Sequence, residues 1–332
     1  MNPLQRTPIL VVIIPCYNAE RHIGQVIAEM PPMIERIYCV DDASTDGTAL
    51  LLEQLRNTNR KIRQVSLPQN QGVGGAMIAG YRAAITDASQ NHELDRLILI
   101  KMDSDHQMDP HNIPQLIAPI VSGAADYAKG NRFFYIEDVQ SMPRMRVFGN
   151  ICLSFLNKLS SGYYSIFDPT NGYTAIQGTI AAKINWDKIH RRYFFESDLL
   201  FRLNLLRAVV VDVPMAAHYG DETSHLSIHK QVGPFILGLL RNLGKRIFYN
   251  YFWRDVTPVT LYLVAGGCLV VFALYVGLKF WVMSSFFGQV ATAGKVMLAA
   301  LPMIIGCQFL FSAWQLEMAN EPRLPLHPRI RE

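Results

Sequence analysis

Residues 96–107 read RLILIKMDSDHQ, an apolar stretch that changes abruptly into closely spaced polar residues. A continuous apolar run of this length is typical of a strand that a parallel sheet buries on both faces. Asp103 and Asp105 follow that run at positions i and i+2, where a loop lets both carboxylates reach one cation. Mg²⁺ and Mn²⁺ prefer such oxygen ligands and share their remaining positions with phosphates. The stretch therefore predicts a buried strand that leads into a divalent-metal site.

Strands and helices alternate on the N-terminal side of this stretch. We expect strands at residues 9–14, 36–40 and 63–66, and helices at residues 19–30, 48–58 and 74–88. Such alternation is typical of an α/β fold with a mostly parallel, Rossmann-like sheet and helices on both faces. Ligands bind at the carboxyl ends of the strands in such sheets. Asp41 and Asp42 follow the second strand, so we expect them to share one crevice with Asp103 and Asp105.

Two polar segments near this crevice have alternative explanations. Asp42 suits a hydrogen bond from the base or ribose of a nucleotide, whereas Ser44 and Asp46 suit the N-cap of the next helix. Residues 70–76 read NQGVGGA, which lacks the third glycine of a dinucleotide fingerprint and the Lys-Ser/Thr of a P-loop. Close approach of the backbone to a sugar or phosphate would explain these glycines, and so would tight packing of a helix on the sheet.

The second half of the chain is less regular until it becomes strongly apolar. We expect helices at residues 144–160 and 194–207, and strands at residues 174–177 and 208–213. Residues 232–253 interleave apolar and aromatic residues with basic ones, which is typical of a helix in a membrane interface, although an ordinary packed helix also fits. Residues 259–282 and 296–316 are apolar runs long enough to cross the hydrocarbon core. A buried helical hairpin is the alternative.

The placement of charge bears on topology and on partners. Basic residues gather on both outer flanks of the apolar region, while the loop between its two runs holds only Lys295. By the positive-inside rule, both termini and the domain before the apolar region face the cytoplasm. The net charge of +4 is mild and forms no basic stripe, so we expect no nucleic-acid partner. The five cysteines show no CxxC spacing, which is typical of reduced thiols in a cytosol-facing protein.

Several motifs across residues 9–133 resemble, in order and spacing, the family 2 glycosyltransferases with the GT-A fold. These motifs are PCYNAE (15–20), DDASTDGT (41–48), NQGVG (70–74) and DSDHQ (103–107). With GNR (130–132), DPTNGY (168–173) and the two-helix tail, the chain looks like the polyisoprenyl-phosphate glycosyltransferases, the dolichyl-phosphate-mannose synthase group. Residues 218–226 depart from the pattern, because His and Tyr stand where relatives often have an Arg-containing stretch before a Glu-Ser pair.

The resemblance implies roles for individual residues. The nucleotide-sugar donor would contact Pro15, Tyr17, Glu20, Asp42, Asn70, Gly74, Asp103 and Ser104. The metal, Mg²⁺ or Mn²⁺, and the donor diphosphate would be held by Asp103, Asp105 and Gln107. The acceptor phosphate would meet Arg132, with Arg144 and Arg146 as further candidates or as ordinary surface charges. Catalysis would involve Asp103, Asp105 and Arg132, with Glu196 and Asp198 as candidate bases if the acceptor is a hydroxyl.

The expected activity is transfer of a sugar, with inversion, from a nucleotide-diphosphate sugar to a polyisoprenyl phosphate such as undecaprenyl or dolichyl phosphate. We expect a metal-dependent hexosyltransferase that uses UDP- rather than GDP-linked donors and is integral to the inner or plasma membrane, with homo-oligomer formation left open. The expected parts are a catalytic domain (1–230), an interfacial helix (231–255), a two-helix anchor (256–318) and a cytoplasmic tail (319–332). Transfer to a lipid-linked saccharide hydroxyl and a non-catalytic nucleotide-binding membrane scaffold are the alternatives.

Overall fold

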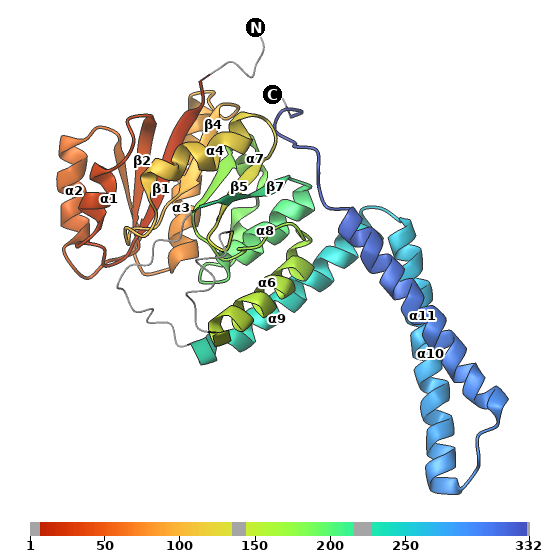
Figure 1. Cartoon of the computed structure of the whole chain (residues 1–332). Coiled ribbons are helices and arrows are strands. Elements are labelled where there is room, and N and C mark those ends of the chain that lie inside the picture. Colours follow the sequence, from red (N-terminus) through yellow and green to blue (C-terminus); the bar gives the residue numbers. More distant parts are fainter. Residues whose placement is uncertain (1–6, 135–143, 216–227, 331–332) are drawn as a thin grey trace. The chain divides into compact units, whose positions relative to one another are not determined.

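The computed structural model describes residues 7–134, 144–215 and 228–330. It divides into two compact units, residues 1–243 with 322–332, and residues 244–321. The first unit contains a sheet whose described strands follow the order β3-β2-β1-β4-β6-β5-β7 (Figure 1). The strands are β1 (Ile9–Cys16), β2 (Ile34–Asp41), β3 (Ile62–Ser66), β4 (Leu97–Lys101), β5 (Tyr127–Asn131), β6 (Thr174–Gln177) and β7 (Val210–Pro214).

The sheet is mostly parallel, as predicted. Strand β1 pairs in parallel with β2 and β4, and β5 pairs in parallel with β7, while β6 runs antiparallel between β4 and β5. Cys16 of β1 lies opposite Asp41, and Ile13 lies opposite Lys101. The loops that follow β2 and β4 therefore leave the sheet at the same edge, on either side of β1.

Helices cover both faces of this sheet. The helices of the first unit are α1 (Ile23–Ala28), α2 (Thr48–Thr58), α3 (Val73–Gln90), α4 (Ile113–Val121), α6 (Arg144–Ser161), α7 (Gly178–Lys183), α8 (Phe195–Leu206) and most of α9 (Ile228–Phe248). Alternate β1 residues point to opposite faces. Val11 and Ile13 pack with α3, α7 and α8, whereas Val12 and Ile14 pack with α1, α2 and α4. The apolar run of β1 is thus buried on both sides.

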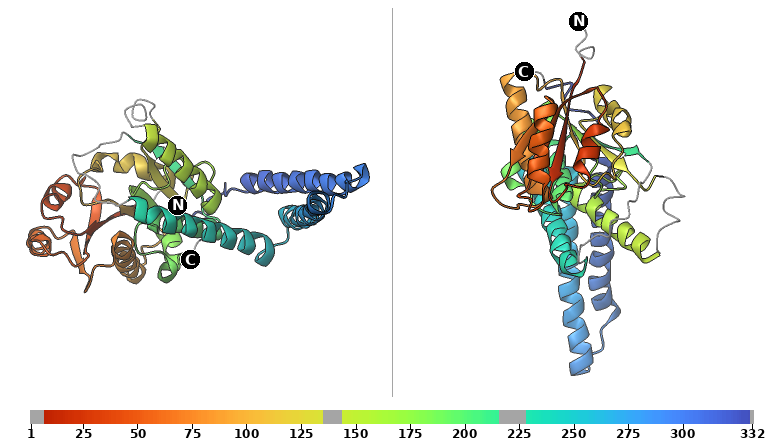
Figure 2. Two further views of the ribbon diagram at one scale, coloured as in Figure 1. Left: turned by 90° about the horizontal axis from the view of Figure 1, so that it is seen from below. Right: turned by 90° about the vertical axis from the view of Figure 1, so that its left-hand side faces the viewer.

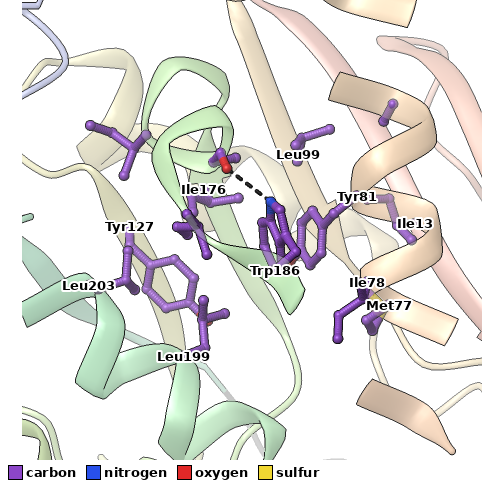
Figure 3. Close-up of a cluster of buried hydrophobic side chains, with 14 of the residues drawn as sticks. Ile13, Met77, Ile78, Tyr81, Leu99, Tyr127, Ile176, Trp186, Leu199 and Leu203 are labelled. Atoms are coloured by element: carbon purple, nitrogen blue, oxygen red, sulfur yellow. Dashed lines mark hydrogen bonds between the residues drawn. The ribbon is translucent and has the colours of Figure 1, made fainter. Parts of the chain in front are cut away.

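The cluster on the α3 side is centred on two aromatic rings (Figure 3). Tyr81 of α3 stacks on Trp186, with ring centroids 4.5 Å apart. The indole nitrogen of Trp186 donates a hydrogen bond to the carbonyl of Ala181 at 3.0 Å. This contact fixes the segment that leads from α7 towards α8, the helix that carries Glu196.

Three elements differ from the sequence prediction. Helix α1 begins at Ile23 rather than near residue 19, because the amide of Ala19 donates to Thr48 Oγ1 at 2.8 Å and holds the preceding loop. The predicted elements included neither α4 nor β5. Strand β5 reads YAKGN, and all five residues are buried. Its lysine and asparagine interrupt the apolar pattern by which a buried strand is predicted from sequence.

Residues 322–330 pack on the first unit. Leu326 and Ile330 contact its apolar core, and the amides of Leu326 and His327 donate to the carboxylate of Asp126 at 2.9 and 2.8 Å. Asp126 is fully buried, and its other oxygen also accepts from the amide of Val209 at 2.8 Å. One carboxylate therefore ties this segment to the edge of the sheet.

The second unit is built around α10 (Pro258–Phe287) and α11 (Ala293–Ala319), which lie side by side (Figures 1 and 2). Gly266 and Gly306 let the two backbones approach, since a Cβ added to Gly266 would lie 2.9 Å from the carbonyl oxygen of Gly306. A buried ion pair joins Arg246 to Glu317 within this unit. By length and composition, both helices are long and apolar enough to cross a membrane.

Helix α9 and the π-helical turn Tyr249–Trp253 occupy the predicted amphipathic region. One face of α9 packs against the first unit, where Phe235 meets Phe194 edge to face at 5.0 Å. Leu237 and Leu240 are exposed on the same helix. The packed face fits an ordinary helix and the exposed leucines fit an interfacial one, so the membrane-interface role stays a prediction.

Candidate active site

The acidic loop after β4 carries the predicted metal ligands. Asp103, Ser104, Asp105 and Gln107 are all partly exposed at the carboxyl end of the strand. The loop is held by a local turn in which the amide of Gln107 donates to Asp105 Oδ1 at 3.1 Å. His106, between them, has a φ of 60° and pairs with Glu29 at 2.7 Å. The two carboxylates thus lie on a short, fixed loop at the ligand-binding edge of the sheet.

A buried lysine links this loop to helix α8. Lys101 Nζ lies 2.9 Å from Asp103 Oδ1 and 3.1 Å from Glu196 Oε1. The contact with Asp103 is an ion pair rather than a well-aligned hydrogen bond. Burial acts to lower the pKa of Lys101, but the two carboxylates outweigh it and raise the pKa above its ordinary value. Glu196, predicted as a candidate base, therefore belongs to the same cluster as Asp103.

The loop at residues 168–173 closes against this cluster. A Cβ added to Gly172 would lie 2.3 Å from Lys101 Nζ and 2.8 Å from Asp103 Oδ2, so a larger residue there would displace both charged groups. Asp168, at the start of the loop, is fully buried and accepts from Arg132 Nε at 2.8 Å and from its Nη2 at 3.3 Å. The bidentate pair fixes the guanidinium of Arg132 against the start of this loop.

Strand β5 places a second lysine beneath the site. Lys129 is fully buried and donates to the carbonyl of Asn171. Burial lowers the pKa of Lys129 to about 8, against the attraction of Glu196 and Asp168. Asp212 of β7 lies in the same charged layer, and burial raises its pKa to about 6. Lys129 and Asp212 thus bind the backbone of the loop at residues 167–171 from the strands of the sheet.

Asp42 holds the glycine-rich turn. Its two carboxylate oxygens accept from the amides of Gln71 and Gly72 at 2.7 and 2.8 Å. Gly72 has a φ of 80°, a conformation that favours glycine. Burial raises the pKa of Asp42, and these hydrogen bonds oppose the rise. Asp42 therefore shapes the loop, and its predicted contact with a nucleotide stays a prediction.

The loops after β1 and β2 are joined by reciprocal hydrogen bonds. Glu20 Oε2 accepts from the amide of Gly47 at 3.0 Å, and Asn18 Oδ1 accepts from the amide of Thr45 at 2.9 Å. Pro15 lies at the end of β1, and Tyr17 is 51% exposed at the edge of the sheet. Glu20 is thus occupied with the neighbouring loop, whereas Tyr17 offers a ring to a ligand.

Tight packing explains Gly74. A Cβ added there would lie 2.7 Å from the carbonyl oxygen of His190 and 2.7 Å from the carbonyl carbon of Arg191. The amide of Gly75 donates to the carbonyl of Arg191 at 2.8 Å. Of the two readings of these glycines, helix packing against the loop before α8 is the one that these contacts favour. Asn70 is exposed at the start of the turn.

Asp198 and Glu196 both lie in the first turn of α8, but they contact different groups. Asp198 Oδ2 accepts from the amide of His190 at 2.9 Å, and its Oδ1 accepts from the side-chain amide of Asn242 at 2.9 Å. These bonds connect α8, the preceding loop and α9. The contacts of Asp198 are therefore those of a residue that holds the fold, and its role as a base stays a prediction.

Two predicted groups are not placed. Helix α6 begins at Arg144, but the side chains of Arg144 and Arg146 lie outside the described part of the chain. The divergent segment at residues 218–226 also lies outside it. The acceptor-phosphate roles of these residues therefore remain predictions.

The acidic loop fits a hard divalent cation that a substrate helps to hold. No group of three His, Cys, Asp or Glu side chains suited to a metal occurs among residues 7–134, 144–215 and 228–330. Asp103 and Asp105 supply two carboxylates, and Gln107 adds an amide. Because Mg²⁺ and Mn²⁺ accept phosphate oxygens and water at their other positions, two protein carboxylates are sufficient.

Sequence reasoning assigned no role to Lys101, Lys129 or Asp212. Their signal is a charged residue inside a strand that the sheet buries, which costs free energy unless other charges pair with it. Lys101 ends the apolar run of β4, so its position was readable in the sequence. Its two partners come from a loop and a distant helix, which no local pattern indicates.

Comparison with known proteins places the chain in a family. The model of Glycosyl transferase family 2 matches residues 11–191. A UDP-N-acetylglucosamine–dolichyl-phosphate N-acetylglucosaminyltransferase of Methanococcus voltae is 27% identical, over 71% of this chain and 97% of its own length. A polyprenol monophosphomannose synthase of Mycolicibacterium smegmatis is 26% identical, over 65% of this chain and 78% of its own.

A solved structure shares the fold. Glucosyl-3-phosphoglycerate synthase from Mycobacterium tuberculosis, in complex with UDP, has a TM-score of 0.51 and 19% identity, over 74% of this chain and 82% of its own. The mixed sheet, the helices on both faces and the acidic loop after β4 agree with the GT-A fold expected from the motifs. The chain therefore belongs to glycosyl transferase family 2.

Proposed function

We propose that this protein transfers a sugar from a nucleotide-diphosphate sugar to a polyisoprenyl phosphate at the cytoplasmic face of a membrane, with inversion at the anomeric carbon. The observation that carries the proposal is the cluster at one edge of the sheet. There Lys101 pairs with both Asp103 and Glu196, and the loop that anchors Arg132 closes against Lys101 and Asp103. Two of the relatives described above support the lipid acceptor, because their names contain dolichyl phosphate and polyprenol.

The donor side rests on the acidic loop. Asp103, Asp105 and Gln107 would hold Mg²⁺ or Mn²⁺ together with the donor diphosphate, and the cation would offset the charge of the leaving group. Tyr17 is exposed beside this edge, where its ring can face the nucleotide. A UDP-linked donor is the preferred choice, because the M. voltae relative is named for UDP-N-acetylglucosamine.

The acceptor side needs little proton transfer. A phosphate monoester is already ionised near neutral pH, since its second pKa is about 6. One of its oxygens forms a bond to the anomeric carbon as the bond from that carbon to the diphosphate breaks. Arg132, whose guanidinium is fixed by Asp168, would hold the acceptor phosphate through its planar, permanently charged group. Orientation and charge, rather than a strong base, would then account for most of the rate.

The membrane part suits such an acceptor. Helices α10 and α11 each have the length and composition of a membrane span. Residues 322–330, which follow α11, belong to the same unit as the sheet, which comes before α10 in the chain. Both ends of the helix pair therefore return to one unit, which favours the catalytic unit and both termini on the same, cytoplasmic side.

The decisive experiment uses the full chain purified in detergent. It is incubated with Mn²⁺ or Mg²⁺, undecaprenyl phosphate and a panel of UDP- and GDP-sugars. We expect one lipid-phosphate sugar to form, and to be lost in Asp103→Ala. Failure of every donor to yield a lipid-phosphate sugar overturns the proposed acceptor.

A specific observation keeps a second acceptor in view. Glu196 is nearly buried beside Asp103, where a carboxylate can also serve as a general base towards a sugar hydroxyl. If a lipid-linked saccharide accepts the sugar and undecaprenyl phosphate does not, that second function replaces the first. An unchanged cellular phenotype in Asp103→Ala would instead favour a non-catalytic scaffold.

A further inference from the structure

A single ammonium group holds two acidic side chains from different elements. Lys101 Nζ reaches Asp103 on the loop after β4 at 2.9 Å and Glu196 on α8 at 3.1 Å. The Lys101 side chain is only 2% exposed, so water screens these charges little. The contact is therefore a strong constraint on where both carboxylates point.

The surroundings of Lys101 are rigid. Its strand is central, since Lys101 lies opposite Ile13 of β1 on one side and Thr174 of β6 on the other. The backbone of Gly172 lies against the ammonium and against Asp103 Oδ2, with no room for a Cβ. The lysine is thus fixed by the sheet below and by a glycine backbone above.

The charges around the acidic loop explain why the lysine matters. Without an ammonium between them, Asp103 and Glu196 would form a pair of like charges that attracts any divalent cation. With Lys101 in place, Asp103 Oδ1 is already engaged, and the side chain is held with Oδ2 beside the backbone of Gly172. The resting protein then offers a weak cation site, and the substrate diphosphate must complete it.

We propose that Lys101 is a positioning residue that sets the orientation of Asp103 and Glu196 and keeps the cation site weak until the donor diphosphate arrives. The proposal rests on the transferase function given above and adds a residue to it. Lys101 itself touches neither the donor nor the acceptor in this role. It acts through the two carboxylates that it holds.

The test compares Lys101→Met with the wild-type full chain in detergent, using Mn²⁺ alone as the first probe. Free Mn²⁺ is counted by electron paramagnetic resonance during a titration without donor. Because a unit positive charge about 3 Å from the site is removed, we expect Mn²⁺ to bind at least about tenfold more tightly. With the donor present, we expect kcat to fall about 100-fold while the donor KM changes little, because the carboxylates are no longer held in place.

Two further variants separate position and charge from damage to the fold. Lys101→Arg keeps the charge but not the shape, so we expect Mn²⁺ affinity near the wild-type value and a reduced kcat. Arg36→Met removes a cation from a partly buried ion pair elsewhere in the sheet, the one with Glu93. We expect it to change neither the Mn²⁺ affinity nor kcat. Loss of Mn²⁺ binding and of kcat together in Lys101→Met would mean a merely structural role.

Other outcomes also decide the matter. Wild-type Mn²⁺ affinity and kcat in Lys101→Met overturn the proposal, while an active wild-type enzyme leaves the transferase function standing. If no acceptor is glycosylated by the wild type, the transferase function fails, yet the Mn²⁺ titration still tests Lys101. If Lys101→Met does not fold, Lys101→Met with Glu196→Gln is compared with Glu196→Gln alone. Equal Mn²⁺ affinities of these two variants overturn the proposal.

Discussion

At the scale of single residues, the site is a layer of charges buried within the sheet. Lys101, Lys129 and Asp212 lie in three different strands, and each meets groups from the loops above. Charges in such a layer are costly unless they are paired. Lys101 holds the acidic loop after β4, whereas Lys129 and Asp212 hold the loop at residues 167–171.

Asp212 gives this layer a measurable pH dependence. Burial raises its pKa from 3.8 to about 6, so the folded protein holds this proton more tightly than the unfolded chain does. The free energy of unfolding should therefore fall as the pH rises from about 4 to about 6, and Asp212→Asn should remove that part of the slope. Urea unfolding read by hydrogen exchange of the β1 amides measures it.

Asp187→Asn is the matched control, because Asp187 has a 74% exposed side chain in a surface ion pair with Arg82. It should leave the slope unchanged. Wild-type and Asp212→Asn curves that run parallel between pH 4 and pH 6 would contradict the assignment.

The residue scale is also where sequence reasoning was uneven. Asp103 and Asp105 were assigned to the site because they follow an apolar run, which is a local pattern, and their role there stays a prediction. The contacts of Asp198 with His190 and Asn242 were not foreseen, since its neighbour Glu196 shares the same pattern of charge and only the fold separates them. The site role of Arg132 stays a prediction, and its pairing with the buried carboxylate of Asp168 was not predicted.

At the scale of elements, strands and helices with a clean apolar period were predicted within a few residues. Helix α2 and strand β6 have the predicted bounds. Strand β5 was missed because its lysine, glycine and asparagine serve the site, so its pattern is that of a loop. The antiparallel direction of β6 depends on pairing with β4 and β5, which no single segment encodes.

Two glycines test how closely elements pack. Gly74 of α3 lies against the backbone of the loop before α8, so Gly74→Ala should cost about 1–3 kcal/mol of unfolding free energy. Gly24 of α1 has nothing within 4 Å of an added Cβ. Gly24→Ala should therefore raise stability by about 0.5–1 kcal/mol, since alanine favours the helix. Urea unfolding of the two variants checks both signs.

A stabilising effect of Gly74→Ala would mean that the loop at His190 and Arg191 moves aside without cost. In that case the turn at residues 70–75 would be free to approach a ligand, and the packing explanation of its glycines would be wrong. A reduced rate with unchanged stability would point the same way.

At the scale of the whole molecule, residues 322–330 belong to the first unit although the second unit precedes them in the chain. Composition and hydropathy predicted the two apolar helices, because a long apolar run is a strong local signal. They did not predict that the following segment returns to Asp126, since that contact joins residues 200 positions apart.

Asp126→Asn should release this segment. Burial acts to raise the pKa of Asp126, but hydrogen bonds from His327, Val209 and Leu326 outweigh it and lower the pKa. An asparagine would present an N–H group to these donors, at a cost of about 2–3 kcal/mol. Trypsin should then cleave faster at Arg323 and Arg329, which are exposed. Mass spectrometry of the digest over time measures the rate of cleavage at each arginine.

Low pH should also release residues 322–330 in the wild type and speed their cleavage. A lowered pKa in the folded state means that the stabilisation is complete above about pH 4 and is lost as the pH falls further. Asp187→Asn again serves as the control, with wild-type cleavage expected. Equal cleavage of Asp126→Asn and the wild type would show that Leu326 and Ile330 suffice to hold the segment.

The hydrogen bonds between Asp126 and residues 322–330 can form only late in synthesis of the chain. The ribosome finishes the sheet long before it makes Leu326 and His327, and both apolar helices emerge in between. Until the helix pair has been made, Asp126 of the first unit keeps its hydrogen bond from Val209 but lacks those from Leu326 and His327. A nascent chain arrested before residue 322 should bind chaperones longer than the finished protein, so completion of the first unit is coupled to synthesis of the helix pair.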